Sequence, residues 1–398
     1  MIQVVIIGAG PTGLTLAMLL VRQGLSVKVI EAARGFQRVF RGEALMPSGL
    51  AAIAQMGLAG LIDDLPHRAI DAWEMHIEDR CLFRVEEPMD ASGKPCMLVS
   101  QPAFLAAIVE QLRASPEFEL LQGVSVQDLL REGERIAGVQ LSDGRKLAAD
   151  LVIGADGRNS LARQKAKLEL IQFNQSFDIL WFKLPMAEQF EQENVFYSFL
   201  KGREGFGFFR GSAGDMQLGW SIHRDNPIDW QNIDWAEKFA SASPEWLTPY
   251  FRSLTGKIDK PMLLSITVGR CPQWHRPGLL LLGDAAHPMS PIRAQGINMA
   301  LRDVVVAANY LTPVLQQSDL SMIDAVLPQI QADREPEIIS TQQLQQQEIN
   351  QGELIRNVPP VRHLVSRFAP VIRPLARKSW LDRQLQLRQG FASIVCNS

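Results

Sequence analysis

Cysteine and histidine are scarce in this 398-residue chain, and neither forms a cluster along the sequence. The four cysteines stand far apart, at positions 81, 96, 271 and 396, and the six histidines have no spacing typical of metal ligands. A disulfide framework needs regularly spaced cysteines, and a zinc site needs paired ligands. We therefore expect neither a disulfide scaffold nor a bound metal.

Long apolar runs and an excess of one charge are also missing. No run reaches the about 18 apolar residues of a spanning helix. The apolar N-terminus lacks basic residues and is interrupted by Gly-Ala-Gly-Pro, unlike a secretory signal. Lys and Arg (40) nearly balance Asp and Glu (43), which gives no general attraction to nucleic acid. With 46% hydrophobic residues, we expect a folded cytoplasmic protein that binds no nucleic acid.

The first motif is a strand, a tight glycine turn and a helix. The run IQVVII precedes Gly8-Ala-Gly10-Pro11-Thr12-Gly13, and a leucine-rich helical pattern follows. Gly8 permits the turn, Gly10 lets a pyrophosphate approach the backbone, and Gly13 lets helix and strand pack closely. The next strand, SVKVIE, ends at Glu31, where a carboxylate can accept ribose hydroxyls. This pattern predicts an ADP-containing cofactor but does not separate nicotinamide from flavin.

Two later segments again place an acid after a buried strand. LVIGADG ends on Asp156, and GLLLLGDAAHPMSPIRAQGIN places Asp284 after a strand and opens a helix at Gly296. Ligands bind at the carboxyl ends of parallel strands, so the three segments can line one crevice. A ribityl flavin fits the third segment better than NAD, because Asp284 can accept from its hydroxyls and the helix start offers N–H donors.

In this order and spacing the three motifs resemble the group A FAD-dependent aromatic monooxygenases, the para-hydroxybenzoate hydroxylase family, over most of the chain. The resemblance implies an α/β fold with a Rossmann-like (GR2-type) FAD-binding domain, an inserted, mostly antiparallel β-sheet substrate domain and C-terminal helices. It predicts FAD-binding segments at 1–71, 100–176 and 269–330, substrate segments at 72–99 and 177–268, and a C-terminal helical region at 331–398.

The resemblance also assigns residues to FAD. The ADP half would be held by Gly8, Gly10, Pro11, Thr12, Gly13 and Glu31, with Arg41 beside the phosphates and Gln101 at a further FAD position. Asp156 belongs to a motif linked to FAD and pyridine nucleotide. Gly283 and Asp284 would meet the ribityl chain, and Gly296, Ile297 and Asn298 the flavin pyrimidine ring. Structural roles stay open: a solvated loop for Arg41, a helix start for Gln101, and a helix N-cap for Asp156 and Asp284. His287 is favoured as structural.

The function implied is an FAD-dependent monooxygenase that uses NADH or NADPH transiently and hydroxylates an aromatic, phenolic or polycyclic molecule with O₂ through a flavin 4a-hydroperoxide. No second GxGxxG follows a strand, so the pyridine nucleotide is expected to have no Rossmann domain of its own. Alternatives are a halogenase, whose WxWxIP pattern is absent, an isoprenoid- or quinone-type reductase or hydroxylase for a lipophilic substrate, and a non-catalytic FAD-bound sensor.

The substrate pocket is less well marked. Phe206, Phe208, Phe209 and Trp220 lie in alternating strands and either line an aromatic cavity or, at least as plausibly, pack the core of their own sheet. Only three tyrosines occur, at 197, 250 and 310, and none is an evident phenol-activating group.

Two features stay open. Arg293 stands where related sequences have small residues, often glycine, so it projects toward the flavin or its entrance, as the one catalytic candidate, or faces solvent. Residues 351–398 carry eight Lys and Arg and two acids. Such a basic amphipathic end can rest on an anionic membrane, although a solvated terminal helix is favoured. The protein is expected to be a monomer or homodimer.

Overall fold

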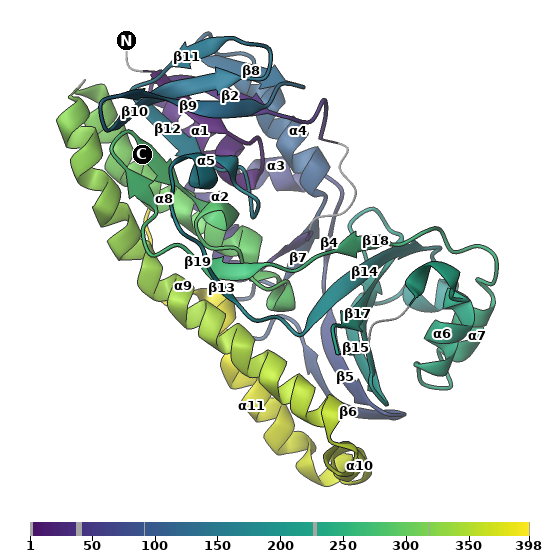
Figure 1. Cartoon of the computed structure of the whole chain (residues 1–398). Helices are drawn as coiled ribbons and strands as arrows, with labels where there is room; N and C mark the ends of the chain where they lie inside the picture. Colours follow the sequence, from purple (N-terminus) through teal and green to yellow (C-terminus); the bar gives the residue numbers. More distant parts are fainter. Residues whose placement is uncertain (1–2, 37–41, 91, 226–228, 318, 398) are drawn as a thin grey trace.

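The structure is a computed structural model that describes residues 3–36, 42–90, 92–225, 229–317 and 319–397 (Figure 1). Its first layer is a six-stranded sheet in the order β20-β21-β12-β1-β2-β8. All neighbours pair in parallel except the edge strand β20. The strands are β1 Gln3–Ile7, β2 Ser26–Glu31, β8 Phe118–Gln122, β12 Leu151–Gly154, β20 His275–Arg276 and β21 Leu279–Leu281.

Helices α1, α4 and α8 pack around this sheet, and α1 contacts both of the others. Their apolar residues and the buried strands form the largest hydrophobic core. The helices of this domain are α1 Pro11–Arg22, α2 Pro47–Gln55, α3 Ala59–Asp63, α4 Gln101–Leu112, α5 Leu161–Lys165 and α8 Gln295–Gln316. Short 3-10 turns precede α8 (η3 Gly283–Ala285 and η4 Ile292–Ala294).

The second layer is a seven-stranded sheet in the order β18-β14-β17-β16-β15-β5-β6. Only β15 and β5 pair in parallel; the other pairs are antiparallel. The strands are β5 Ala72–Ile77, β6 Arg80–Glu86, β14 Phe177–Leu184, β15 Val195–Lys201, β16 Glu204–Arg210, β17 Met216–His223 and β18 Met262–Leu264. Helices α6 Trp235–Ser241 and α7 Thr248–Arg252 cover its outer face, with η1 Glu188–Phe190 and η2 Trp230–Asn232 nearby. The predicted fold class is confirmed.

Three small sheets complete the fold: β3-β7-β4, β9-β10-β11 and β13-β19. Their strands are β3 Ala44–Leu45, β4 His67–Ala69, β7 Met97–Val99, β9 Val126–Glu132, β10 Arg135–Leu141, β11 Lys146–Ala148, β13 Ile171–Phe173 and β19 Val268–Arg270. Within segment 72–99, predicted as part of the substrate domain, residues 97–99 pair with β3 and β4 and not with the seven-stranded sheet.

The C-terminal helices begin earlier than the sequence pattern predicts. The expected boundary after residue 330 falls inside α9, which runs from Leu320 to Asn357 despite Pro328 and Pro336. It extends from the six-stranded sheet to the far end of the other sheet, where α10 (Pro359–Arg367) and α11 (Ala369–Gln389) follow (Figure 1). Tertiary packing of the buried side of α9 overrides the unfavourable proline propensity. Among the described helices, none combines the length and the apolar character needed to cross a membrane.

Candidate active site

The ends of β1 and β12 approach so closely that the first turn requires glycine. Gly8 has a φ of +104°, and a Cβ there would lie 2.4 Å from the Ala155 carbonyl oxygen. A Cβ on Gly13 would lie 2.0 Å from the Gly8 oxygen, so α1 packs directly on the turn. A Cβ on Gly10 would instead meet nothing within 4 Å. The turn is thus closed toward the protein and open at Gly10, at the unprotected N-terminus of α1.

The third motif packs against the first two. Gly283 has a φ of +58°, and a Cβ there would lie 2.7 Å from the Thr12 hydroxyl oxygen. Arg163, which follows the Asp156 segment, donates from Nη1 to the Ala285 oxygen at 2.8 Å. A Cβ on Gly296 would lie 3.6 Å from Asp284 Oδ1, which places the Asp284 carboxylate beside the start of α8. All three strand-end segments therefore meet at one edge of the six-stranded sheet.

Two predicted acidic residues have protein partners at this edge. Glu31 is buried and accepts from the backbone N–H groups of Ala9 (3.0 Å) and Ala33 (2.8 Å). Asp156 accepts from the Ser160 hydroxyl and from the first N–H groups of α5, the N-terminal role that its sequence left open. The roles of Glu31 and Asp156 toward FAD stay predictions.

Asn298 fixes the start of α8 with its side chain. Its Oδ1 accepts from the Met46 N–H at 2.9 Å, and its Nδ2 donates to the Ala294 and Ala44 oxygens. Gly49 is needed opposite, because a Cβ there would lie 2.0 Å from Asn298 Oδ1. The backbone N–H groups of the first turn of α8, which includes Gly296 and Ile297, have no side-chain cap. Gln101 begins α4 and is partly exposed, whereas Arg41 lies outside the described residues.

These residues fit FAD. An open glycine turn at an uncapped helix N-terminus suits a pyrophosphate, and an acid beside a second uncapped helix suits hydroxyls and ring carbonyls. Gly8, Gly10, Pro11, Thr12 and Gly13 would hold the pyrophosphate half, and Asp284 with the first turn of α8 the flavin half.

A buried ionic network supports the third motif and was not foreseen from the sequence. His287 Nε2 lies 2.6 Å from Asp303 Oδ2, which also accepts from the Gly283 N–H at 3.1 Å. Arg334 of α9 binds the other Asp303 oxygen at 2.8 Å and also pairs with Glu337, which in turn binds Arg302. Burial by itself would raise the pKa of Asp303, but His287 and Arg334 hold it below its ordinary value. The sequence offered only one signal for this network, which is that Asp303 stands on the helix, α8, that begins at the third motif.

Arg293 is neither solvent-facing nor unpartnered. It has a φ of +61°, and its side chain is 10% exposed. Nη2 lies 2.7 Å from Glu348 of α9, and the guanidinium lies 4.7 Å from the Trp380 ring centroid in α11. The solvent-facing alternative is therefore wrong, and the side chain joins the start of α8 to the C-terminal helices.

The four aromatic residues singled out in the sequence divide between the two faces of the seven-stranded sheet. Phe206, Phe208 and Trp220 are buried on the outer face, in the core formed with α6 and α7. Only Phe209 lies on the opposite face, in the cluster that includes residues from β3 and the start of α8. For three of the four, packing of the sheet's own core is confirmed.

The opposite face, here called the junction face, carries further rings that the sequence did not identify. Phe196 stacks between Trp73 (4.8 Å) and Phe209 (4.9 Å), and Trp181 meets Phe209 edge-on at 6.0 Å. Glycines seat them, since a Cβ on Gly219 would lie 2.9 Å from Trp181. Strand alternation of rings with glycines, as in GFGFF, was the available signal. Ala44, Met46 and Ala294 join the same cluster, so the junction face meets the flavin-side elements.

Polar groups border the junction face. Trp181 Nε1 donates to Gln217 Oε1 at 2.6 Å, and Gln217 donates to Asp215 at 2.7 Å. Glu43, just before β3, accepts from the Ser212 N–H at 2.9 Å in the β16–β17 turn. Burial, with the nearby Asp215 charge, raises the pKa of Glu43 above its ordinary value. None of the three tyrosines belongs to this cluster among the described residues; Tyr197 and Tyr250 pack on the outer face.

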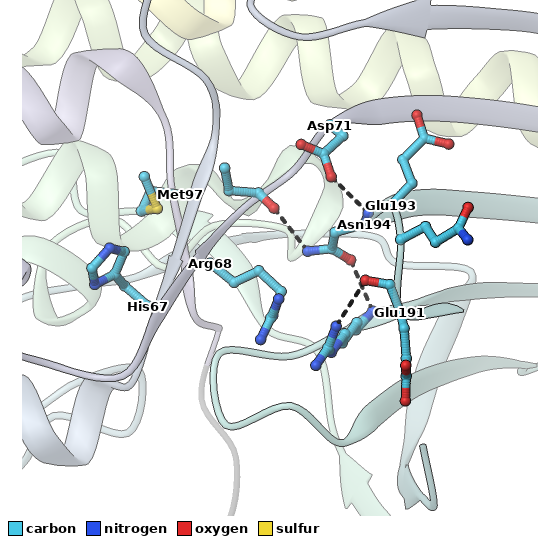
Figure 2. Close-up of a pocket in the computed structure, with 10 residues that line it drawn as sticks. His67, Arg68, Asp71, Met97, Glu191, Glu193 and Asn194 are labelled. Carbon is cyan, nitrogen blue, oxygen red and sulfur yellow. Dashed lines mark hydrogen bonds between the residues drawn. The ribbon is translucent and has the colours of Figure 1, made fainter. Parts of the chain in front are cut away.

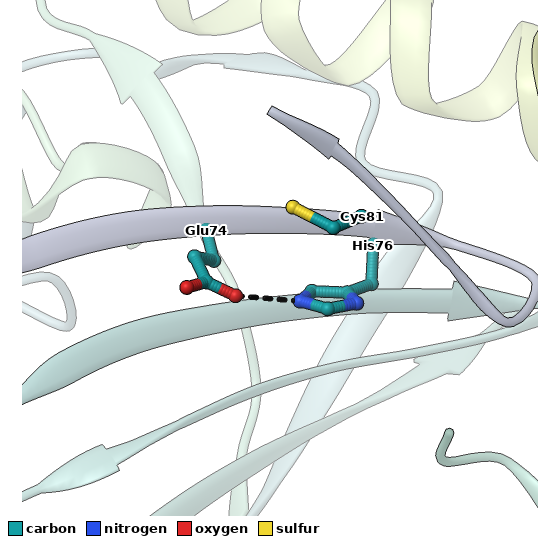
Figure 3. A group of neighbouring side chains, drawn as sticks. All are labelled: Glu74, His76 and Cys81. Carbon is teal, nitrogen blue, oxygen red and sulfur yellow. Dashed lines mark hydrogen bonds and ion pairs between the residues drawn. The ribbon is translucent and has the colours of Figure 1, made fainter. Parts of the chain in front are cut away.

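A cavity and a cluster of polar side chains lie away from the edge of the six-stranded sheet that carries the predicted FAD residues. A cavity of about 300 Å³ between β4, β7 and residues 191–194 contains Arg68 and the Asn194 amide, which donates to the Ala69 oxygen (Figure 2). On the outer face, Glu74, His76 and Cys81 each offer one possible metal-ligand atom, and these atoms lie within 4.8 Å of one another (Figure 3). Glu74 is already bound by His76 and Arg84, at 2.8 and 2.7 Å. None of the predicted FAD residues lines either group, and we assign neither to the site.

Comparison with known proteins agrees with this geometry. Residues 1–329 match the family model described as FAD binding domain. The chain is 31% identical to 6-methylpretetramide 4-monooxygenase of Streptomyces rimosus, over 97% of this chain and 94% of that protein. The chain belongs to the FAD-binding monooxygenase family. The predicted family, enzyme class and FAD cofactor are thereby confirmed.

More distant members of the family agree. A probable NADH-specific resorcinol 4-hydroxylase of Rhodococcus jostii is 26% identical over 85% of this chain, which spans 63% of that protein. The crystal structure of p-nitrophenol 4-monooxygenase PnpA from Pseudomonas putida superposes with a TM-score of 0.79 at 19% identity, over 99% of this chain and all of that one. PqsL of Pseudomonas aeruginosa superposes with a TM-score of 0.77 at 22% identity, over 93% of this chain and 99% of that one. At these identities, the two structures show the fold.

Proposed function

We propose that this monooxygenase hydroxylates a phenolic, polycyclic aromatic molecule bound between the junction face and the start of α8, with O₂ and NADH or NADPH as co-substrates. The observation that carries the proposal is the row of stacked rings, Trp73, Phe196 and Phe209, in one cluster with Ala294 at the start of α8. An apolar wall of rings with a few polar groups at its border suits an aromatic ligand. The similarity to the 6-methylpretetramide enzyme supports a polycyclic substrate.

The chain's own residues bind and orient the substrate and exclude water from it. Bound FAD supplies electron acceptance from the reduced pyridine nucleotide and activation of O₂. The N–H groups at the start of α8 stabilise negative charge on a group held against them, because they are fixed donors that need no reorientation. The junction rings keep the reacting ring away from water.

Glu43 is the residue best suited to accept the proton of a phenol hydroxyl. Its carboxylate lies at the border of the junction face, and burial raises its pKa toward the range in which a carboxylate accepts protons effectively at neutral pH. Proton transfer from the hydroxyl to a Glu43 oxygen would leave an electron-rich phenolate ring, the form that is more easily hydroxylated. Among the described residues, no tyrosine belongs to the junction cluster and could take this role instead.

The direct test measures oxidation of NADH and NADPH by the FAD-loaded protein with a panel of single-ring and polycyclic phenols. We expect stimulation of oxidation by polycyclic phenols and a product that carries one atom of ¹⁸O from ¹⁸O₂. Oxidation that no phenol stimulates, or a reduced product without ¹⁸O, would contradict the proposal and favour the sensor or reductase alternatives.

The proposed binding of FAD is tested at Asp284. Asp284→Ala should weaken FAD binding by about 1–3 kcal/mol, because a buried hydroxyl of the cofactor loses its acceptor. Titration of apoprotein with FAD, followed by flavin fluorescence, measures this loss. Asp143→Ala is the matched control, since this exposed acid lies in the turn between β10 and β11, outside the predicted site, and is bonded to Arg145. Equal FAD affinity for Asp284→Ala and the unmodified protein would remove Asp284 from the site.

A further inference from the structure

We infer that the corner formed by α10 and α11 is a docking surface for an anionic lipid membrane. Four large apolar side chains are exposed there: Leu364 (55%), Phe368 (46%), Val371 (77%) and Leu375 (73%). We call these four the apolar tip. Leu364 lies on α10 and Phe368 at the break between the two helices, and Val371 and Leu375 lie one turn apart on α11. The inference concerns where the protein binds and does not depend on the proposed reaction.

The apolar tip is the outward side of helices that are firmly anchored on their inward side. Ala369 and Trp380 of α11 are buried in the junction cluster. Arg373 donates to the Cys81 and Leu82 oxygens of the edge strand β6, and Arg377 donates to the Arg84 oxygen. Figure 1 shows α10 at the end of the molecule away from the six-stranded sheet, and α11 running back from there past β6. The tip is therefore held outward by the fold.

The charge around the apolar tip has one sign. Residues 354–381 contain six Lys and Arg and no Asp or Glu. Arg356 and Arg362 are buried in ion pairs with Asp225 and Glu78. Arg367 and Lys378 are exposed beside the tip. Apolar side chains flanked along the chain by exposed cations match the acyl chains and headgroups of an anionic lipid surface.

The composition disfavours two other arrangements. A solvated terminal helix, which the basic sequence by itself favours, leaves four large apolar side chains in water without a reason. A second copy of the chain, seated tip to tip by a twofold axis, would bring Arg367 and Lys378 of both copies together, where like charges repel.

The surface also lies close to the proposed substrate site. On the inward side of α11, the Trp380 ring lies 6.2 Å from Trp73, a ring of the junction face. A lipophilic aromatic molecule that partitions into lipid would thus be concentrated near the protein that consumes it.

The test is co-sedimentation of the full-length, FAD-loaded protein with vesicles of phosphatidylcholine alone or of phosphatidylcholine with one quarter phosphatidylglycerol. We expect binding to the anionic vesicles, weaker binding to the neutral ones, and loss of binding at high salt. Val371→Ser/Leu375→Ser should reduce the anionic-vesicle partition coefficient by roughly tenfold or more. Both side chains are exposed, so the fold and FAD content should be retained.

Ile171→Ser/Leu263→Ser is the matched control, because both residues are exposed apolar side chains on strands distant in sequence from the tip. It should bind vesicles as the unmodified protein does. Equal binding of neutral and anionic vesicles, or equal loss in both variants, would overturn the inference. So would a concentration-dependent dimer, seen by light scattering, that Val371→Ser/Leu375→Ser abolishes while the unmodified protein ignores vesicles.

Discussion

The two faces of the seven-stranded sheet are built from the same strands but are finished differently. On the outer face, Phe182, Phe206 and Trp220 are fully covered by α6 and α7. On the junction face, Trp181 and Phe196 are only partly buried and rest on glycines, with Gln217 at the border. The outer face therefore contributes mainly stability, whereas the junction face, where some rings stay partly accessible, is the face to which we assign the proposed substrate site. The difference arises because α6 and α7 cover the outer face, whereas the junction face meets α11 and elements of the six-stranded domain.

The largest difference should appear in stability. Phe208→Ala, on the outer face, should lower the free energy of unfolding by about 3–5 kcal/mol, because it leaves a cavity among buried rings. Phe196→Ala, on the junction face, should cost less, about 1–2 kcal/mol, because its ring is already partly exposed. Urea denaturation of both variants measures the gap. Equal losses would show that the junction face is packed as a core.

The next effect concerns turnover. Trp181→Phe should lower kcat/KM for a phenolic substrate by about tenfold, since a junction ring shrinks and Gln217 loses its indole donor. Trp235→Phe on the outer side also loses an indole hydrogen bond, to the Trp230 oxygen, and should change kcat/KM by less than about twofold. Steady-state kinetics with one substrate compares the two. Similar changes in both variants would remove the functional distinction between the faces.

A third test uses acids with opposite pKa shifts. Burial raises the pKa of Glu43 above its ordinary 4.5, so turnover should fall as pH decreases through that raised value, where the protonated acid no longer accepts. Glu43→Gln should remove this acid limb of the kcat/KM profile. Because the raised pKa disfavours ionised Glu43 in the folded state, its contribution to stability is present at low pH and lost as pH rises. The variant should therefore be at least as stable at neutral pH.

Glu74, on the outer face, supplies the contrasting sign. Burial alone would raise its pKa, but hydrogen bonds from His76 and Arg84 hold it below the ordinary value. Its ionised form thus stabilises the fold near neutral pH, and this contribution is lost as pH falls through the lowered pKa. Glu74→Gln should destabilise at neutral pH and leave the kcat/KM profile unchanged in shape. Thermal unfolding across pH checks both acids, and a lost acid limb in Glu74→Gln would contradict the assignment.

The smallest effect is expected at Arg293. Arg293→Gly removes the strain of a left-handed backbone conformation, which costs about 1 kcal/mol of stability. The same change loses the Glu348 ion pair and the Trp380 contact. These effects nearly cancel, so stability should change by less than about 1 kcal/mol. Arg293→Ala loses the contacts without the full backbone relief and should be the less stable variant. A slower flavin reduction in both variants at unchanged FAD affinity would instead place the guanidinium in the reaction.

The strand-end motifs could be predicted because their requirements are local. Gly8 and Gly283 have a positive φ, and a Cβ on Gly13 would collide with the Gly8 oxygen of the same turn, so each requirement leaves a direct mark on the local sequence. Alternation likewise predicted the strands of the second sheet. Glu43 could not be found this way, because its raised pKa depends on a turn some 170 residues later in the chain.

The sequence by itself determined the FAD-binding architecture, the family and the presence of an aromatic-rich sheet, since backbone conformation and strand periodicity are encoded within a few neighbouring residues. The tertiary structure decided which rings face the flavin side, where Arg293 points, and that Asp303 and Arg334 brace the third motif. Those outcomes depend on which helices cover which face of a sheet. Coverage is settled by packing between segments far apart in the chain, and no single segment encodes it.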